Sequence, residues 1–453
     1  MSAVDVSIGN ALGRSFFLFS SCLVFCSCAG IYGPALQPKV NALLVADRPS
    51  EAAQELMAPK AGYGHNNEVL YQLDRALILQ MNRDFPGSIG ALEKAKAGYE
   101  ELYTRSVTNE ASTWLVNDNM SPYRAPGYER VLMNVFQSFN YMASGSWDEA
   151  LVESRDLDSK FPVNADAFLQ KKRPLEDNGF ARLLAGILYE ARGGAGDLNE
   201  AYIAYKQSLV VYDAYYDRQY VPQVLQEGLL RLAAKFNDSL LPQYRSRFGK
   251  VFPASGSDNA VIYFFEALGF SPVKVSEMIP VPIEPDLITK MAFPRFVRRP
   301  YAAQGSEALL DSISGSRFRV TTELGVDIDG LAEKNLEAGK ALALSKAVLR
   351  PAAKYLIERN QQKAIEKKHG LLAGQLFGLA SSLYNIISEQ ADLRSWQSLP
   401  AQVRVARLAV PAGMYHLHGQ GLDGGGLVVN SWDGGDVELL PGRIYCIFRR
   451  GLQ

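Results

Sequence analysis

The chain has 453 residues, a formal net charge of −1, 47% hydrophobic residues and 21% charged residues. This length suits two or three domains, and the apolar content is sufficient for a large buried core. Because the net charge is close to zero, no global electrostatic field draws nucleic acid, so we expect no nucleic-acid partner.

The first element is an apolar run at residues 16–26, which follows Arg14. A basic residue, a short apolar run and a small-residue exit are typical of a secretory signal. The run is shorter than the roughly 20 apolar residues that span a bilayer. Its end, Phe25-Cys26-Ser27-Cys28-Ala29-Gly30, resembles the lipobox of bacterial lipoproteins, with a small residue on each side of Cys28.

This resemblance implies that residues 1–27 are a signal peptide and that Cys28 carries a lipid anchor to a membrane. In such lipoproteins an Asp after the cysteine usually retains the protein at the inner membrane. Here Ala29 occupies that place, so the resemblance implies the outer membrane, facing the periplasm. The alternative is a plain secretory or membrane-anchoring signal. After processing, Cys446 would be the only cysteine, which excludes an internal disulfide.

Residues 28–250 are predicted to form a helical domain, because apolar residues recur there at three- and four-residue spacing. Helix–turn–helix units are expected at 69–99, 131–161 and 180–212. GSWDEAL in the second unit aligns without a gap with GDLNEAY in the third. We expect a glycine to turn the chain, a large residue to wedge between the helices and an alanine to allow close approach. The predicted residues are Gly145, Trp147, Ala150, Gly196, Leu198 and Ala201.

These units resemble the tetratricopeptide repeat, in which helix pairs carry small and aromatic residues at such places. The resemblance implies a stacked array whose concave face binds a protein partner's peptide or helix. The alternative is an irregular helical bundle. A group of tyrosines either lines that groove or packs between helices, and packing is the preferred interpretation. The group is Tyr202, Tyr205, Tyr212, Tyr215, Tyr216 and Tyr220.

Residues 251–326 are predicted to be rich in β-structure. The stretches 259–266 and 273–283 are β-branched and aromatic, and Gly269 and Pro272 between them suggest a hairpin. Further strands are expected at 291–297 and 316–322. The prolines of this region suit sheet edges. Arg295, Arg298 and Arg299 are interpreted as a solvated edge.

Residues 327–398 are predicted to form long helices, and 370–388 contain no charged residue. Small residues recur there at every fourth position and so share one helix face, a pattern that permits close backbone approach. We interpret this segment as a buried hairpin helix; the alternative is a membrane-inserted or oligomerising helix. The face consists of Gly370, Gly374, Gly378 and Ser382.

Residues 399–453 are predicted to form a small β-sandwich-like module. His416 and His418 share a strand face and could form half of a metal site, but ordinary histidines are preferred. Cys446 alternates like a buried strand residue rather than a nucleophile. Gly419–Gly426 is interpreted as a flexible loop. We therefore expect no catalytic residues, no metal, no cofactor and no enzymatic activity.

The expected fold class is multidomain α+β, with a helical repeat array, a β segment, long helices and a β module. This order, with ADLRSWQSLPAQVRVARL and PAGMYHL, resembles a family of uncharacterised bacterial lipoproteins with tetratricopeptide-like N-terminal halves. The resemblance covers nearly the whole chain but implies only architecture and location. The expected function is that of a membrane-anchored periplasmic scaffold that binds protein partners. The alternative is an oligomeric component of an outer-membrane secretion or surface-assembly machine, and a cell-wall enzyme is a third, weaker interpretation.

The lipobox interpretation predicts that Cys28→Ala abolishes acylation. Intact mass spectrometry should show a diacyl or triacyl addition at Cys28 in the wild type only, and the variant should leave the membrane fraction. An unmodified wild-type chain that still sediments with membranes would contradict lipidation.

Overall fold

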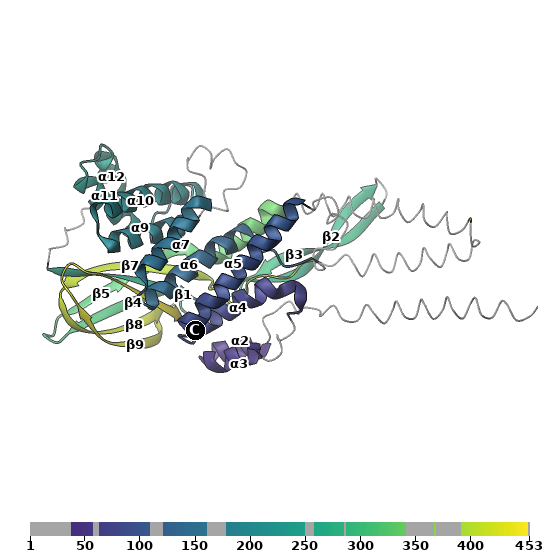
Figure 1. The fold of residues 1–453 in the computed structure, drawn as a ribbon, viewed down its shortest axis with the longest axis horizontal. Helices are drawn as coiled ribbons and strands as arrows, with labels where there is room; N and C mark the ends of the chain where they lie inside the picture. The colour runs from purple at the N-terminus through teal and green to yellow at the C-terminus, as the bar shows by residue number, and fades with distance from the viewer. Residues whose placement is uncertain are drawn as a thin grey trace, which may run out of the picture.

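The structure is a computed structural model that describes residues 38–57, 63–108, 121–160, 178–249, 258–284, 287–340, 367 and 391–451. Most of the helices form a layer on one side of two β-sheets, whereas the first two helices, at 38–45 and 49–57, lie at the lower edge of the view (Figure 1). The predicted mixed α+β class is confirmed. Cys28 and the small-residue face of Gly370, Gly374, Gly378 and Ser382 lie outside the described residues.

The helical layer is built from helices that each pack against the next one along the chain. α6 and α9 are buried on nearly all sides, whereas α5, α7 and α10 expose one face. The helices are α2 (Pro38–Val45), α3 (Pro49–Met57), α4 (Glu68–Met81), α5 (Phe85–Thr108), α6 (Gly127–Ala143), α7 (Trp147–Lys160), α9 (Gly179–Arg192), α10 (Ala195–Tyr215), α11 (Gln223–Lys235) and α12 (Leu241–Phe248), with a 3-10 turn at η3 (His65–Asn67).

The turns of the three predicted helix pairs each contain one residue in the left-handed region. These residues are Arg83 (φ 58°), Gly145 (φ 75°) and Gly193 (φ 80°). Such a residue reverses the chain after a helix, and glycine adopts this conformation without strain. The prediction of Gly196 as a turn residue was wrong, because Gly196 lies inside α10 and Gly193 makes the turn.

The inner sheet has the strand order β10–β1–β7–β6. β1 (Asn259–Leu268) pairs in parallel with β10 (Ile444–Gly451) and antiparallel with β7 (Gln402–Pro411), which also pairs with β6 (Glu323–Asp327). Side chains of β1 alternate between the layers: Phe265 packs in the core shared with the helices, and Ile262 packs in the core shared with the second sheet.

The outer sheet has the order β5–β4–β8–β9 and is antiparallel throughout. Its strands are β4 (Gly305–Ser312), β5 (Arg317–Thr321), β8 (Gly413–Leu422) and β9 (Val428–Leu439). Leu310 and Leu417 point inward and share a buried core with Ile262 of the inner sheet. The two sheets therefore form a sandwich, and the helices cover the inner sheet's other face.

Strand pairing corrects two of the predicted divisions. Segments 251–326 and 399–453 do not form separate β units, because both four-stranded sheets contain strands from each segment; the two sets alternate in the inner sheet and meet at the β4–β8 pair in the outer sheet. The predicted hairpin between 259–266 and 273–283 was also wrong, since β1 pairs with β7 and β10 instead. A strand that is apolar on both faces is stable at the centre of a sheet covered on both sides.

β2 (Val273–Glu284) and β3 (Leu287–Val297) form a two-stranded ribbon that extends away from the sheets (Figure 1). Pro280, Pro282 and Pro294 pair with Lys290, Ile288 and Ser276, so all three occupy the same class of antiparallel pair. Proline has no N–H to donate, so it suits the class of pair in which the backbone N–H and C=O groups point away from the partner strand. At the three proline positions the outer edges of the ribbon therefore have no N–H donor, which disfavours pairing with a further strand.

Residues 391–401 form an irregular segment between the helical layer and the inner sheet. Trp396, Leu399 and Ala401 are each at most 1% exposed. Further helix follows β6 at 328–340. In the part of the chain that the structure describes, no helix combines the length and apolarity needed to cross a membrane.

An aromatic cluster joins α6 to the inner sheet, so we expect that truncating one of its rings lowers the stability of the fold strongly. The ring of Phe139 lies 4.5 Å from that of Phe448 and 5.2 Å from that of Phe265. Phe139→Ala should lower the free energy of unfolding by about 3–5 kcal/mol in urea titrations. Tyr103→Ala, at a residue of α5 that lies on the surface, should change it by less than about 0.5 kcal/mol. Equal effects of both variants would contradict this packing.

Candidate functional site

The inner face of the helical layer, where a repeat array would hold a peptide, is covered by the chain's own residues. Phe136 of α6 packs against Trp396 and Phe448, and Phe180 of α9 packs against Phe265. In this structure that face is therefore not available to a partner. Any partner surface has to be sought elsewhere on the described body.

The predicted turn residues lie where helices approach each other. Ala150 and Ala201 are both 0% exposed, and Ser138 of α6 donates to the carbonyl of Ala150 (3.3 Å). Trp147 and Leu198, in the first turns of α7 and α10, are half-buried against the same core. The expected roles of these four residues in helix packing agree with their positions.

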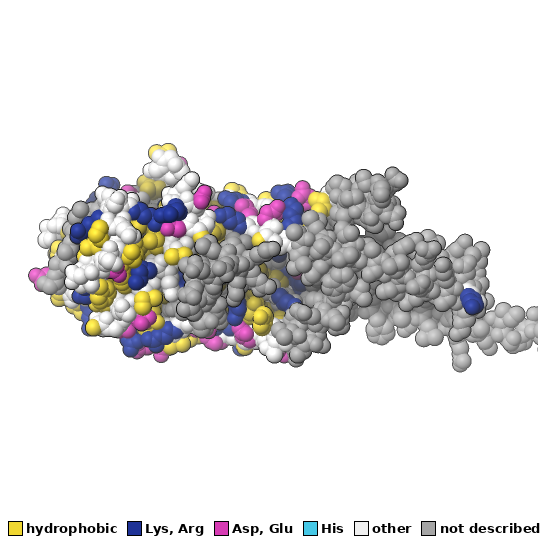
Figure 2. Space-filling view, turned by 90° about the horizontal axis from the view of Figure 1, so that it is seen from above, with side chains coloured by type: hydrophobic (Ala, Val, Ile, Leu, Met, Phe, Trp, Pro, Cys, Tyr) yellow, Lys and Arg dark blue, Asp and Glu magenta, His cyan; other side chains and the backbone are white. Residues whose placement is uncertain are grey.

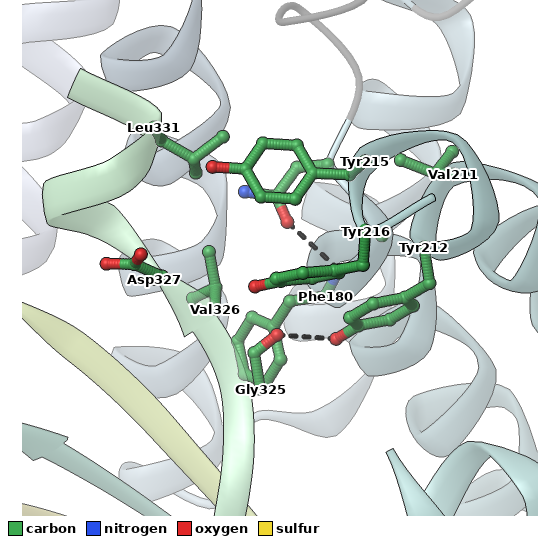
Figure 3. Close-up of a pocket in the computed structure, with 11 residues that line it drawn as sticks. Phe180, Val211, Tyr212, Tyr215, Tyr216, Gly325, Val326, Asp327 and Leu331 are labelled. Atoms are coloured by element: carbon green, nitrogen blue, oxygen red, sulfur yellow. Dashed lines mark hydrogen bonds between the residues drawn. The ribbon is translucent and has the colours of Figure 1, made fainter. Parts of the chain in front are cut away.

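The tyrosines at the end of α10 and in the following turn, from Tyr212 to Tyr220, form an interface with β6 rather than an open groove (Figure 3). Tyr212 donates to the carbonyl of Gly325 (2.5 Å), and Tyr220 donates to that of Leu324 (2.6 Å). Tyr216 lies against Tyr212 with ring centroids 6.1 Å apart. The preferred interpretation of these residues as packing between elements agrees with this geometry.

A small hollow remains beside these rings, with a volume of about 20 Å³. Asn178 accepts from Phe180 through its amide oxygen (2.9 Å), which directs Nδ2 elsewhere. Among the described atoms, neither this Nδ2 nor the Tyr215 hydroxyl has a hydrogen-bond partner, and both residues line the hollow. The volume and two polar groups suit one water molecule rather than an organic ligand.

Two buried carboxylates hold the 391–401 segment against the helices. Asp74 of α4 accepts from the Tyr63 hydroxyl (2.7 Å) and from the Ser398 amide (2.9 Å). Glu129 of α6 accepts from the Tyr123 hydroxyl (2.6 Å) and from the Trp396 amide (3.1 Å). These bonds satisfy backbone donors that the irregular segment would otherwise bury without partners. We call this arrangement the carboxylate clamp.

Burial raises the pKa of Asp74 and of Glu129 to about 6 in each case, although hydrogen bonds to each carboxylate oppose the rise. Both residues are 0% exposed. Sequence reasoning missed them, because an acid in a helix normally indicates its solvated side.

Two half-buried arginines complete the attachment of this segment by donating to carbonyls. Arg299 donates to the carbonyls of Ser271 (2.8 Å) and Gln397, and Arg450 donates to that of Ser398 (3.1 Å). Burial lowers the pKa of Arg299 to about 10 and that of Arg450 to about 9. The expectation that Arg299 belongs to a solvated edge was wrong.

A second buried ionic cluster joins α9 and α11 to the inner sheet. Glu190 lies 2.7 Å from Arg231 and accepts from the Tyr205 hydroxyl (2.9 Å), and Glu227 pairs with Arg407. Each carboxylate has an arginine partner, which is the arrangement that buried charges require. Two helix glycines that sequence reasoning overlooked leave room for the Tyr205 ring of this cluster. A Cβ at Gly186 or Gly228 would meet that ring at 2.3 or 2.7 Å.

Cys446 lies in β10 and packs on the core, but it is half-buried rather than fully buried as its alternation predicts. Burial raises the pKa of its thiol, so the thiolate that nucleophilic chemistry requires is disfavoured.

His416 and His418 share the outer face of the outer sheet, with ring centroids 5.9 Å apart. His416 lies 2.8 Å from Asp436 and 3.2 Å from Asp433, and His418 lies 3.2 Å from Asp311. The hydrogen bond to Asp436 raises the pKa of His416. Within the described ranges, no three His, Cys, Asp or Glu side chains are grouped so as to hold a metal ion.

The expected flexible loop at Gly419–Gly426 is partly strand, because β8 continues to Leu422. Beyond it, the Asp423 carboxylate accepts from the amides of Gly425 (2.9 Å) and Leu427 (2.8 Å). These bonds make an ordered turn, with no helix behind it to bind phosphate.

Comparisons with known proteins found no matching family model, no matching curated protein and no matching solved structure. The structural features available for a functional proposal are therefore a helical layer whose inner face is covered, two buried ionic clusters and a projecting ribbon.

The carboxylate clamp predicts a specific pH dependence. Because the folded-state pKa of Asp74 lies above its unfolded value, its stabilising contribution is complete below about pH 4 and is lost as the pH rises through about 6. The rise from 3.8 to about 6 corresponds to about 3 kcal/mol. Relative to Asp74→Asn, the wild type should lose up to about this free energy of unfolding between pH 4 and pH 7.

Urea titrations across this pH range measure the effect. Glu438→Gln, at an exposed residue of β9, is the matched control and should follow the wild type. Identical pH dependence of the wild type and Asp74→Asn would show that Asp74 is not held in the buried setting described.

Proposed function

We propose that the protein is a membrane-anchored periplasmic scaffold that binds a protein partner through its projecting β2–β3 ribbon. The observation that carries the proposal is the ribbon itself, which extends from the body and leaves the Met278 side chain 65% exposed. A large apolar side chain on a projecting element suits contact with a partner. We assign the protein no catalytic role and no cofactor.

The ribbon is attached firmly at its base. Lys274 donates to the carbonyl of Arg394 (2.9 Å), and Phe293 and Phe296 are at most 9% exposed. Further out, the sequence Ile279-Pro-Val-Pro-Ile283 is entirely apolar. An isolated two-stranded ribbon is only marginally stable in water, so packing against a partner would stabilise its outer part. The prolines favour recognition by side chains over strand addition.

The helical layer is, in this proposal, a divergent tetratricopeptide-like array. Its left-handed turn residues and its fully buried Ala150 and Ala201 support that interpretation. The array's inner face binds the chain's own sheet, so it acts as a rigid support. The opposite side, seen in Figure 2, carries basic, acidic and apolar side chains mixed over its surface.

Location is proposed from the sequence alone. Lipidation at Cys28 would tether the body to the outer membrane on its periplasmic side. The alternative is an oligomeric component of an outer-membrane secretion or surface-assembly machine, in which the partner of the ribbon is another copy of the chain. The small-residue pattern at 370–382 is the feature that supports this alternative.

Photo-crosslinking in intact cells tests the ribbon directly. A photoreactive phenylalanine at Met278 should give a covalent adduct with a partner protein. The same group at Ile313, which is 86% exposed in the β4–β5 turn, is the control and should give none. An adduct of twice the chain mass would favour the oligomeric alternative, and equal yields at both positions would contradict a specific role for the ribbon.

A further inference from the structure

Strand β10 lies at the edge of the inner sheet, yet it has the sequence of a central strand. Ile444, Cys446 and Phe448 pack toward the helical layer, whereas Tyr445 and Ile447 pack toward the outer sheet. A strand that is apolar on both faces is typical of a position with a neighbouring strand on each side. The sequence of β10 therefore suits a sheet that continues beyond it.

The backbone of β10 uses only one of its two edges. Val261 of β1 donates to the carbonyl of Arg443 (2.9 Å). Because the backbone groups of successive strand residues point to opposite edges, the odd-numbered residues of β10 face β1 and the even-numbered residues face away from it. Among the residues that the structure describes, the amides and carbonyls of Ile444, Cys446 and Phe448 have no hydrogen-bond partner.

The other edges of the described sheets are protected against further pairing. β5 and β9 carry exposed charged side chains, and β9 also pairs with β8 through an irregular register. Tyrosines at the end of the helical layer donate to carbonyls of β6, and the ribbon contains prolines. Such features prevent edge strands from pairing with another chain. The first five residues of β10 include no charged residue and no proline, so this edge lacks that protection.

The charges at the ends of β10 discriminate between two kinds of added strand. Arg443 is exposed just before the strand and has no carboxylate at ion-pair distance in the described part of the chain. Near the other end, Arg449 pairs with Glu266. A second copy of the chain, paired antiparallel around Cys446, would bring its own Arg449 opposite Arg443, and like charges placed opposite each other destabilise a strand pair. The edge therefore suits a different chain that carries negative charge.

We propose that β10 binds an extended segment of a partner protein, which adds to the inner sheet as a further strand and carries an acidic residue beside Arg443. The backbone of this segment exchanges hydrogen bonds with Ile444, Cys446 and Phe448. In strand addition the main-chain hydrogen bonds provide affinity, and the side chains next to them provide specificity. The inference does not depend on the role proposed for the ribbon.

Fluorescence anisotropy with labelled synthetic peptides and the full chain tests the proposal. The probe EVTVTVTVE favours an extended conformation and has an acid at each end, so it suits either strand direction. KVTVTVTVK should bind at least about threefold more weakly because its charge is reversed. EVTPTPTVE should not bind because its prolines remove backbone donors. Absence of binding by EVTVTVTVE, or equal binding by the proline peptide, would overturn the proposal.

Variants of the full chain locate the binding. Arg443→Glu should reverse the preference between the acidic and the basic peptide, because the added charge repels glutamate. Ile444→Pro removes an outward amide at the first residue of the strand, where proline is tolerated, and should weaken binding about tenfold. Arg245→Glu, at an exposed arginine of α12, is the matched control and should change the affinity by less than about twofold. An unchanged preference in a folded Arg443→Glu would contradict the site.

Hydrogen exchange reports directly on the edge. In the free chain the amides of Cys446 and Phe448 should exchange faster than those of Tyr445 and Ile447, and EVTVTVTVE should slow only the faster pair. Equal protection of all four amides in the free, dilute chain would show that the edge is already covered and would overturn the proposal. Protection that rises with chain concentration alone would assign the edge to a second copy and would also overturn it.

Discussion

The burial of β1 on both faces is the constraint on which the architecture depends. A strand with Ile262 toward one side and Phe265 toward the other is stable only if both sides are covered. The outer sheet covers one side, and α6 and α9 cover the other. Since β1 pairs with strands from the C-terminal part of the chain, the inner sheet joins the two halves of the chain and contributes to two cores, one shared with the helical layer and one shared with the outer sheet.

The same constraint determines how polar groups are buried between the layers. The irregular segment that leads into β7 passes between helices and sheet, where its amides and carbonyls have no water to bind. Asp74 and Glu129 accept from the amides, and Arg299 and Arg450 donate to the carbonyls. The β2–β3 ribbon, through which we propose that the protein binds its partner, projects away from these layers.

Local sequence patterns predicted much of the fold, but they could not predict which strands pair across long distances in the sequence. Helical spacing and small residues such as Gly145 identified the helix pairs, because these signals act within a few residues. The partner of β1 could not be found in this way, since Val261 pairs with Ile444 far along the chain. Residues 193–196 contain three glycines, so the sequence pattern alone does not distinguish Gly193, which makes the turn, from Gly196.

The candidate sites were less predictable than the fold. The sequence indicates that an acid such as Asp74 lies on the surface, and only its neighbours in space show that it is buried. The histidines were correctly placed on one strand face, because strand alternation is strict. Their neighbours Asp311 and Asp433 come from other strands, and no local rule predicts such contacts.

Native-state hydrogen exchange of the 391–401 segment tests the central claim most directly, that the chain itself closes the inner face of its helical layer. The Trp396 and Ser398 amides, which donate to buried carboxylates, should exchange only through global or near-global unfolding. Their protection should therefore match that of the β1 core amides. Exchange as fast as that of an unstructured peptide would contradict the account and leave the inner face open to a partner.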